Sequence, residues 1–160
     1  NVDKIAKQVG VGAVVFQELS NSRIKDYTFS WSRTLSFEGE TGPYVQYTHA
    51  RCCAVLRKAE EDVTTDINYE LLNDVDSAEV LKVIASFNKT ILNSMRKNEP
   101  HIITRFVLDL AQAFNKFYHD NSILVEDAEL RKARLALVAA TRQALENGLK
   151  LLGMQAPERM

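Results

Sequence analysis

Two cysteines and one histidine stand at a spacing that could serve metal binding or nucleophilic catalysis. His49 and Cys53 are four residues apart, as on one face of a helix, and Cys52 adjoins Cys53. A closed zinc site needs four ligands, usually in recognisable pairs. The other two histidines, His101 and His119, lie eighteen residues apart in a different segment. We therefore interpret this group as a buried cysteine beside a capping or surface histidine, with no metal site.

Two tyrosines and an arginine could instead contact nucleic acid. Tyr44, Tyr47 and Arg51 follow one another at spacings of three and four, so a helix would place two phenols and a guanidinium along neighbouring surface. Unpaired bases stack on aromatic rings, and arginine can meet a phosphate or a base edge. On periodicity alone, half-buried packing of both tyrosines with solvated hydroxyl groups is the favoured interpretation.

No motif for a self-contained active site is present. The sequence has no G-x-x-x-x-G-K-[ST] phosphate loop and no G-x-S-x-G nucleophile elbow. Gly10 and Gly12 lack the third glycine and the preceding strand of a dinucleotide-binding fingerprint. We therefore expect no catalytic residues in this chain.

The formal net charge of −1 hides two regions of opposite sign. Residues 60–81 contain eight acids and no base, whereas residues 131–160 contain six bases and two acids. Without the acidic segment, 20 bases stand against 13 acids, which leaves phosphate binding open. Lys132 and Arg142 are candidates for phosphate contact. The alternative is that both regions are solvated surface.

Cysteine usage and hydropathy bear on location. Adjacent cysteines pair poorly in a disulfide, so a reducing, cytoplasmic location is expected. The longest apolar stretches fall far short of the ~20 residues that cross a bilayer, and we expect no membrane partner. The first residues contain neither an initiator methionine nor an apolar signal region. We expect the sequence to be a piece of a longer chain.

Hydrophobic periodicity predicts an all-α fold, an antiparallel helical bundle with a short extended N-terminal connector. Pro43 suits a first helical position, Ser77 is a candidate N-cap, and Asn147-Gly148 is a candidate helix end. Aromatic and polar residues alternate in the segment 27–37, which predicts a short strand pair or an extended connector. Long helices are expected at residues 3–19, 43–59, 77–98, 100–121 and 127–145, with a short helix at 66–72.

Five segments resemble, in the same order, the C-terminal part of the arginyl-tRNA synthetase family. Thr48 is a departure, because the family commonly has alanine there. The segments are VGVGAVVFQEL at 9–19, LSFEGETGPYVQYTHAR at 35–51, DLAQAFNKFY at 109–118, ARLALVA at 133–139 and GLKLLGMQAPERM at 148–160.

The resemblance implies the C-terminal part of a class I enzyme that attaches arginine to its tRNA in two ATP-dependent steps. Residues 1–37 would be the tail of the catalytic region and a connector, and residues 38–160 a helical anticodon-binding domain. The motifs that hold ATP and arginine would lie upstream of residue 1. The segment alone would therefore be inactive and hold no cofactor, with ATP and Mg²⁺ belonging to the parent enzyme.

The same resemblance implies a tRNA-binding site made of Tyr44, Arg51, Tyr118 and Met160. The two tyrosines would stack on unstacked anticodon bases, Arg51 would meet backbone or base edge, and Met160 would pack its thioether against a base. The implied partners are the anticodon stem-loop of arginine tRNA and the catalytic domain of the same polypeptide. The terminal segment 156–160, which contains Pro157, would be functional surface. The alternative is a helical protein-interaction module without RNA binding.

Overall fold

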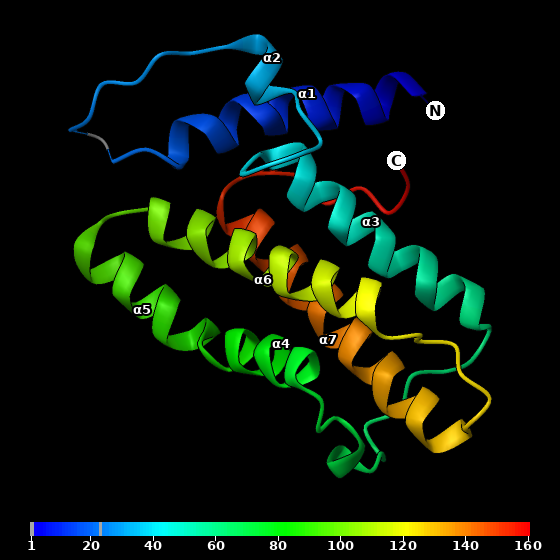
Figure 1. Cartoon of the computed structure of the whole chain (residues 1–160). Coiled ribbons are helices and arrows are strands. Elements are labelled where there is room, and N and C mark those ends of the chain that lie inside the picture. Colours follow the sequence, from blue (N-terminus) through cyan, green and yellow to red (C-terminus); the bar gives the residue numbers. More distant parts are fainter. Residues whose placement is uncertain (1, 23) are drawn as a thin grey trace.

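The computed structural model describes residues 2–22 and 24–160, and within this part every regular element is helical (Figure 1). This confirms the predicted all-α fold class. None of the helices in the described part is both long and apolar enough to span a bilayer. The elements are α1 (Val2–Leu19), α2 (Trp31–Thr34), α3 (Gly42–Ala59), η1 (Tyr69–Leu71, a 3-10 turn), α4 (Val75–Ala85), α5 (Phe87–Lys97), α6 (His101–Asp120) and α7 (Ala128–Leu151).

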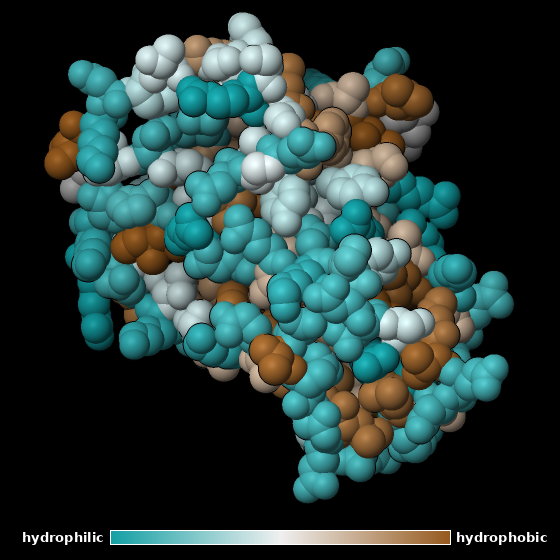
Figure 2. Space-filling model, viewed as in Figure 1, coloured by the Kyte–Doolittle hydropathy of each residue, from teal (hydrophilic) through white to brown (hydrophobic). Residues whose placement is uncertain are grey.

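Helix α6 forms the centre of the bundle, with α4 and α5 packed on one side and α3 and α7 on the other (Figure 1). Phe114 and Phe117 of α6 and Leu145 and Leu149 of α7 are fully buried in the shared core. The surface seen in Figure 2 is mostly hydrophilic, with its hydrophobic residues scattered in small groups. Burial of the apolar faces of the outer helices against a central α6 that is buried on two sides therefore accounts for the architecture.

Two glycines bring α1 close to α3. A Cβ atom at Gly12 would lie 2.8 Å from the amide nitrogen of Gln46, and one at Gly42 would lie 2.8 Å from the Cβ of Phe16. Thr41 caps α3 by accepting a hydrogen bond from the backbone N–H of Tyr44 (3.2 Å). The predicted helices 3–19 and 43–59 are therefore confirmed, and the glycines allow their close approach.

The connector between α1 and α3 is extended as predicted, but the strand pair is not formed. Its described part contains the single-turn helix α2 and no strand. The alternating aromatic residues find no partner strand. Instead, Phe29 and Trp31 pack edge to face on each other, with ring centres 4.8 Å apart, and both are exposed.

The predicted helix 77–98 is two helices, and Ser77 is not its N-cap. Asp74 caps α4, since its carboxylate accepts hydrogen bonds from both the backbone N–H (2.8 Å) and the hydroxyl (2.6 Å) of Ser77. Although partial burial disfavours its charge, these hydrogen bonds hold the pKa of Asp74 below its ordinary value. The helix is interrupted at Ser86, whose hydroxyl donates a hydrogen bond to the carbonyl of Val83 (2.7 Å).

Helix α7 continues beyond Asn147-Gly148, so the predicted helix end was placed too early. Gly148 is buried inside α7, where an added Cβ would overlap the side chain of Val107 on α6. The helix stops after Leu151, and Gly153 then takes a positive φ of 73°. Gly148 thus serves helix packing, and Gly153 serves the turn into the C-terminal tail, residues 152–160.

Candidate nucleic-acid interface

An aromatic and arginine stack lies at the junction of α3 and α6. The guanidinium carbon of Arg51 is 5.0 Å from the ring centre of Tyr47 and 4.9 Å from that of Tyr118. The outer ring neighbours are Phe37, 6.3 Å from Tyr47, and Phe114, 6.2 Å from Tyr118. The exposed fractions of Tyr47 and Tyr118 are 41% and 42%. A planar cation therefore lies between two tyrosines that water, and hence a ligand, can reach.

Asn115 of α6 fixes this stack from behind. Its carbonyl oxygen accepts a hydrogen bond from Arg51, and its amide nitrogen is 2.9 Å from both the hydroxyl of Tyr44 and that of Thr48. Thr48 also donates to the backbone carbonyl of Tyr44 at 2.9 Å. Thr48 thus adds a second hydroxyl partner for the Asn115 amide.

A groove of about 510 Å³ opens beside the stack. Four of its lining residues are cationic, and its lining in the described chain includes no aspartate or glutamate side chain. The combination of aromatic, apolar and cationic side chains suits a nucleic-acid strand, which presents both bases and phosphates. The lining residues are Tyr47, Ala50, Arg51, Ala54, Val55, Arg57, Lys58, Tyr118, Arg159 and Met160.

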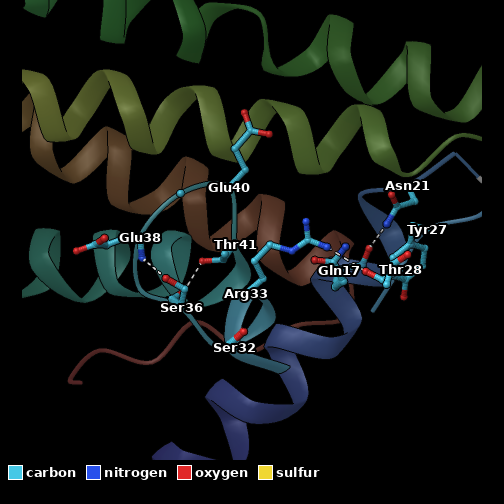
Figure 3. Close-up of a pocket in the computed structure, with 11 residues that line it drawn as sticks. Gln17, Asn21, Tyr27, Thr28, Ser32, Arg33, Ser36, Glu38, Glu40 and Thr41 are labelled. Carbon is cyan, nitrogen blue, oxygen red and sulfur yellow. Dashed lines mark hydrogen bonds between the residues drawn. The ribbon is translucent and has the colours of Figure 1, made fainter. Parts of the chain in front are cut away.

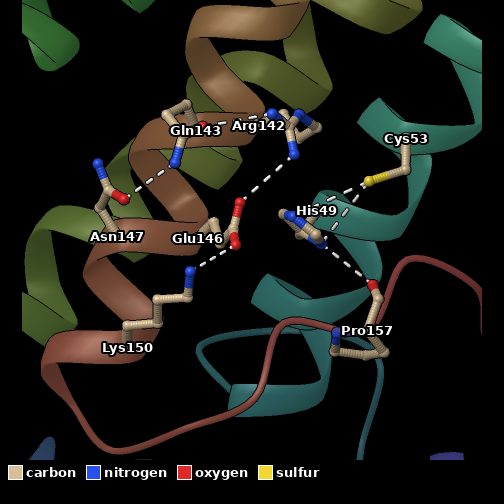
Figure 4. A network of polar contacts seen from close by, with 8 residues as sticks. All are labelled: His49, Cys53, Arg142, Gln143, Glu146, Asn147, Lys150 and Pro157. Atoms are coloured by element: carbon tan, nitrogen blue, oxygen red, sulfur yellow. Dashed lines mark hydrogen bonds and ion pairs between the residues drawn. The ribbon is translucent and has the colours of Figure 1, made fainter.

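The C-terminal tail reaches this groove because α3 binds its backbone. The carbonyl of Gln155 accepts a hydrogen bond from Gln46 (2.8 Å), and that of Pro157 lies 3.0 Å from Nδ1 of His49. Pro157 is buried, and Figure 4 shows its carbonyl directed at the His49 ring. The tail therefore follows α3 and ends at Met160, which is 40% exposed.

Burial determines the protonation of His49, which is 1% exposed. Burial lowers the pKa of His49 despite the hydrogen bond to the Pro157 carbonyl, which favours the charged form. Glu146 of α7 lies near this site and bonds both Lys150 (2.7 Å) and Arg142 (3.4 Å), as Figure 4 shows. The hydrogen bond from Lys150 is the main reason that the pKa of Glu146 lies below its ordinary value.

The structure brings three of the four sequence-predicted site residues together. Arg51, Tyr118 and Met160 line the groove, whereas Tyr44 lies behind it, half-buried, with its hydroxyl bonded to Asn115. Tyr47 takes the place at the groove that the sequence analysis gave to Tyr44.

Several residues of the groove and of the stack beside it were not predicted as site residues. Asn115 lies within the FNKFY segment, and Arg159 within the C-terminal segment, so the quoted motifs contained both. Lys58 lies seven residues after Arg51 on the predicted helix, so its place on the Arg51 side of that helix could have been inferred from the spacing. Phe37 carried no such signal, because only the folded chain brings its ring beside that of Tyr47.

A second hollow, of about 770 Å³, lies between the end of α1, the connector and the loop before α3 (Figure 3). Its polar side chains form local hydrogen bonds. Arg33 donates to the carbonyl of Thr28 (3.0 Å), and Thr41 donates to the carbonyl of Ser36 (2.6 Å). These bonds close the turns of the connector, and no predicted site residue lines this hollow.

The structure also shows the surroundings of His49, Cys52 and Cys53, which the sequence analysis considered as metal ligands or catalytic residues. Across residues 2–22 and 24–160, no group of three or more histidine, cysteine, aspartate or glutamate side chains could hold a metal ion. Cys52 is fully buried, and burial raises the pKa of its thiol strongly. Cys53 lies 3.9 Å from both ring nitrogens of His49. The hydrogen-bonding partner of His49 is the Pro157 carbonyl of the C-terminal tail.

Solved structures with a similar fold include two arginyl-tRNA synthetases. The fold matches Thermus thermophilus arginyl-tRNA synthetase with a TM-score of 0.88 and 33% identity, over 100% of this chain and 28% of that one. It matches arginyl-tRNA synthetase from Plasmodium falciparum with a TM-score of 0.88 and 27% identity, over the same shares.

Proteins of similar sequence point to the same family. The chain is 82% identical over its full length to an arginine–tRNA ligase of Clostridioides difficile (strain 630), and 58% identical to one of Alkaliphilus metalliredigens (strain QYMF). It spans 28% of the length of each of these relatives. Residues 45–160 match the model of the DALR anticodon binding domain. The chain therefore belongs to the DALR anticodon-binding domain family.

Proposed function

We propose that this chain binds the anticodon arm of arginine tRNA. The observation that carries the proposal is the stack in which Arg51 lies between the exposed rings of Tyr47 and Tyr118. Stacking of one base on an aromatic side chain contributes about 1–3 kcal/mol, and it requires a ring face that the base can reach. Membership of the family supports RNA binding over a protein-interaction module without RNA.

The groove residues divide into three roles. Tyr118 and Tyr47 stack on unpaired anticodon bases, and Met160 packs its flexible thioether against one of them. Lys58 and Arg159 are exposed and meet phosphates. Tyr44 contributes indirectly, by orienting Asn115, which in turn holds Arg51.

The proposal extends to a longer parent protein. We propose that the chain works beside a catalytic domain of the same polypeptide, as an arginine–tRNA ligase that uses ATP. Residues 1–37 would belong to that catalytic part and residues 38–160 to the anticodon-binding domain. Because the sequence has no phosphate-binding loop, we assign ATP and Mg²⁺ to the catalytic part, and we expect no arginine activation by this segment alone.

Filter binding tests the proposal. The purified chain is mixed with transcribed arginine tRNA and, separately, with an unrelated tRNA at increasing salt concentrations. We expect tighter binding of arginine tRNA, with a logarithmic salt slope of about −0.7 per phosphate contacted. Equal affinity for both tRNAs, or an absence of binding by a correctly folded chain, would contradict the proposal.

A further inference from the structure

Helix α3 presents two different rows of side chains. One row, Tyr47, Arg51 and Lys58, faces the groove. The other row contains Gln46 and His49, which hydrogen-bond the tail instead. One helix therefore carries part of the groove and also holds the segment that completes it.

Three α3 side chains bind consecutive parts of the tail backbone. In addition to the bonds from Gln46 and His49, Nη1 of Arg57 donates to the carbonyl of Glu158 at 3.2 Å. Arg57 is exposed and Gln46 also bonds the carbonyl of Gln8 (3.3 Å). Among the three bonds, that of His49 is both buried and specific to the tail.

The chemistry of this bond defines the state of His49. A carbonyl oxygen can only accept, so Nδ1 of His49 carries the hydrogen and donates it to Pro157. Nε2 is then an acceptor, with the thiol of Cys53 3.9 Å away. The charged groups that act on the His49 ring are Glu146 and Arg142 of α7 and Glu158 of the tail. Loss of this bond would leave the carbonyl oxygen of the buried Pro157 without its hydrogen-bond donor, which costs free energy.

We propose that His49 is a positioning residue for RNA binding, because its hydrogen bond to Pro157 holds residues 158–160 where Arg159 and Met160 line the groove. This inference rests on the proposed function. A tail that is already ordered spares the binding step the entropy of ordering it. Without the bond, Met160 would leave the groove for part of the time, and RNA binding would weaken although Tyr118 and Arg51 remain in place.

Methyl NMR of the free chain tests the positioning. The sequence has three methionines: Met160 reports on the tail, Met154 is buried before the His49 bond, and Met95 on α5 is exposed. In His49→Leu we expect the Met160 methyl resonance to move toward its position in an unstructured peptide, while that of Met95 stays unchanged. His49→Asn should preserve the Met160 resonance, because its amide nitrogen lies as many bonds from Cα as Nδ1 does.

Matched variants guard against loss of folding. His101→Leu replaces a half-buried histidine at the far end of α6 from Tyr118 and should leave Met160 unmoved. If His49→Leu lacks the helical circular dichroism spectrum, His49→Ala takes its place, since alanine also removes the hydrogen-bond donor. A Met160 resonance that is the same in wild type and in the folded variant would overturn the proposal.

Binding of the anticodon stem-loop of arginine tRNA links position to function. We expect His49→Leu to weaken binding about fivefold or more, His49→Asn to weaken it much less, and deletion of residues 157–160 to remove any further effect of His49→Leu. Equal effects of His49→Leu in the full and shortened chains would overturn the positioning role. If wild type fails to bind while Met160 still responds to His49→Leu, the proposed function is wrong and the control of the tail by His49 stands.

Discussion

The guanidinium of Arg51 lies over the ring of Tyr118, with 4.9 Å between its central carbon and the ring centre. The two residues come from α3 and α6, between which the chain forms η1, α4 and α5. Asn115, one turn before Tyr118 on α6, accepts a hydrogen bond from the same guanidinium. The Tyr118 ring thus contacts the face of the Arg51 guanidinium, and Asn115 bonds its edge. These contacts fix the orientation of the Tyr118 ring, which we propose to stack on a base.

Replacement of Arg51 tests the importance of the planar cation. Lysine keeps the charge but cannot stack as a flat group or reach Asn115 in the same way. We expect Arg51→Lys to weaken stem-loop binding by about 1 kcal/mol, the order of one cation–π contact, with circular dichroism unchanged. Arg96→Lys, at an exposed position of α5, is the control. Equal affinity of Arg51→Lys and wild type would show that the stack is dispensable.

Salt dependence separates phosphate contacts from base contacts. Lys58→Ala and Arg159→Ala should each weaken the binding of arginine tRNA and of an unrelated tRNA to the same extent. Each should also reduce the slope of log affinity against log salt concentration by about one unit. Lys132→Ala is the control: the sequence suggested Lys132 as a phosphate contact, but it pairs with Glu129 (2.9 Å) and does not line the groove. A slope that Lys58→Ala leaves unchanged would remove Lys58 from the proposed RNA path.

Acid should destabilise the chain through His49. Since burial holds the folded-state pKa of His49 below the ordinary 6.5, the unfolded chain binds more protons as the pH falls through that value. The free energy of unfolding should therefore decrease between about pH 7.5 and about pH 5.5 in urea melts. His49→Asn removes the titrating group and should show a smaller decrease. The same decrease in both proteins would place the acid sensitivity elsewhere.

The close approach of α6 and α7 depends on Gly148. Its Cβ would overlap the side chain of Val107, so Gly148→Ala should cost about 1–3 kcal/mol of folding free energy, measured by urea unfolding. In a Val107→Ala background the same change should cost much less, because the overlapping methyl groups are gone. Identical costs in the two backgrounds would contradict the packing described here.

Local signals predicted most helices, and the exceptions are decided by contacts between helices. Pro43 and its neighbours mark the start of α3, and this start is confirmed. The break at Ser86 was not predicted, because the apolar stripe continues across it and only the ring contact of Phe87 with Phe106 (centres 5.1 Å apart) shows how α5 turns onto α6. Gly148 resembled a helix end because sequence does not reveal that Val107 lies opposite.

The site was predictable in part for a similar reason. The resemblance pointed to Arg51, Tyr118 and Met160, and the structure gathers these three from distant segments into one groove. Tyr44 and Tyr47 are three residues apart, so spacing alone does not decide which of them faces solvent. The choice depends on Asn115, whose side-chain amide donates a hydrogen bond to the Tyr44 hydroxyl at the back of the groove.

The central claim is that an unpaired anticodon base stacks on Tyr118, and fluorescence of a base analogue tests it most directly. An arginine-tRNA stem-loop with 2-aminopurine in its anticodon is titrated with wild type, with Tyr118→Leu and with Tyr69→Leu, whose tyrosine is exposed outside the groove. We predict quenching on binding by wild type and Tyr69→Leu, its loss with Tyr118→Leu, and an affinity loss of about 1–3 kcal/mol. Equal quenching and affinity for all three proteins would contradict the account.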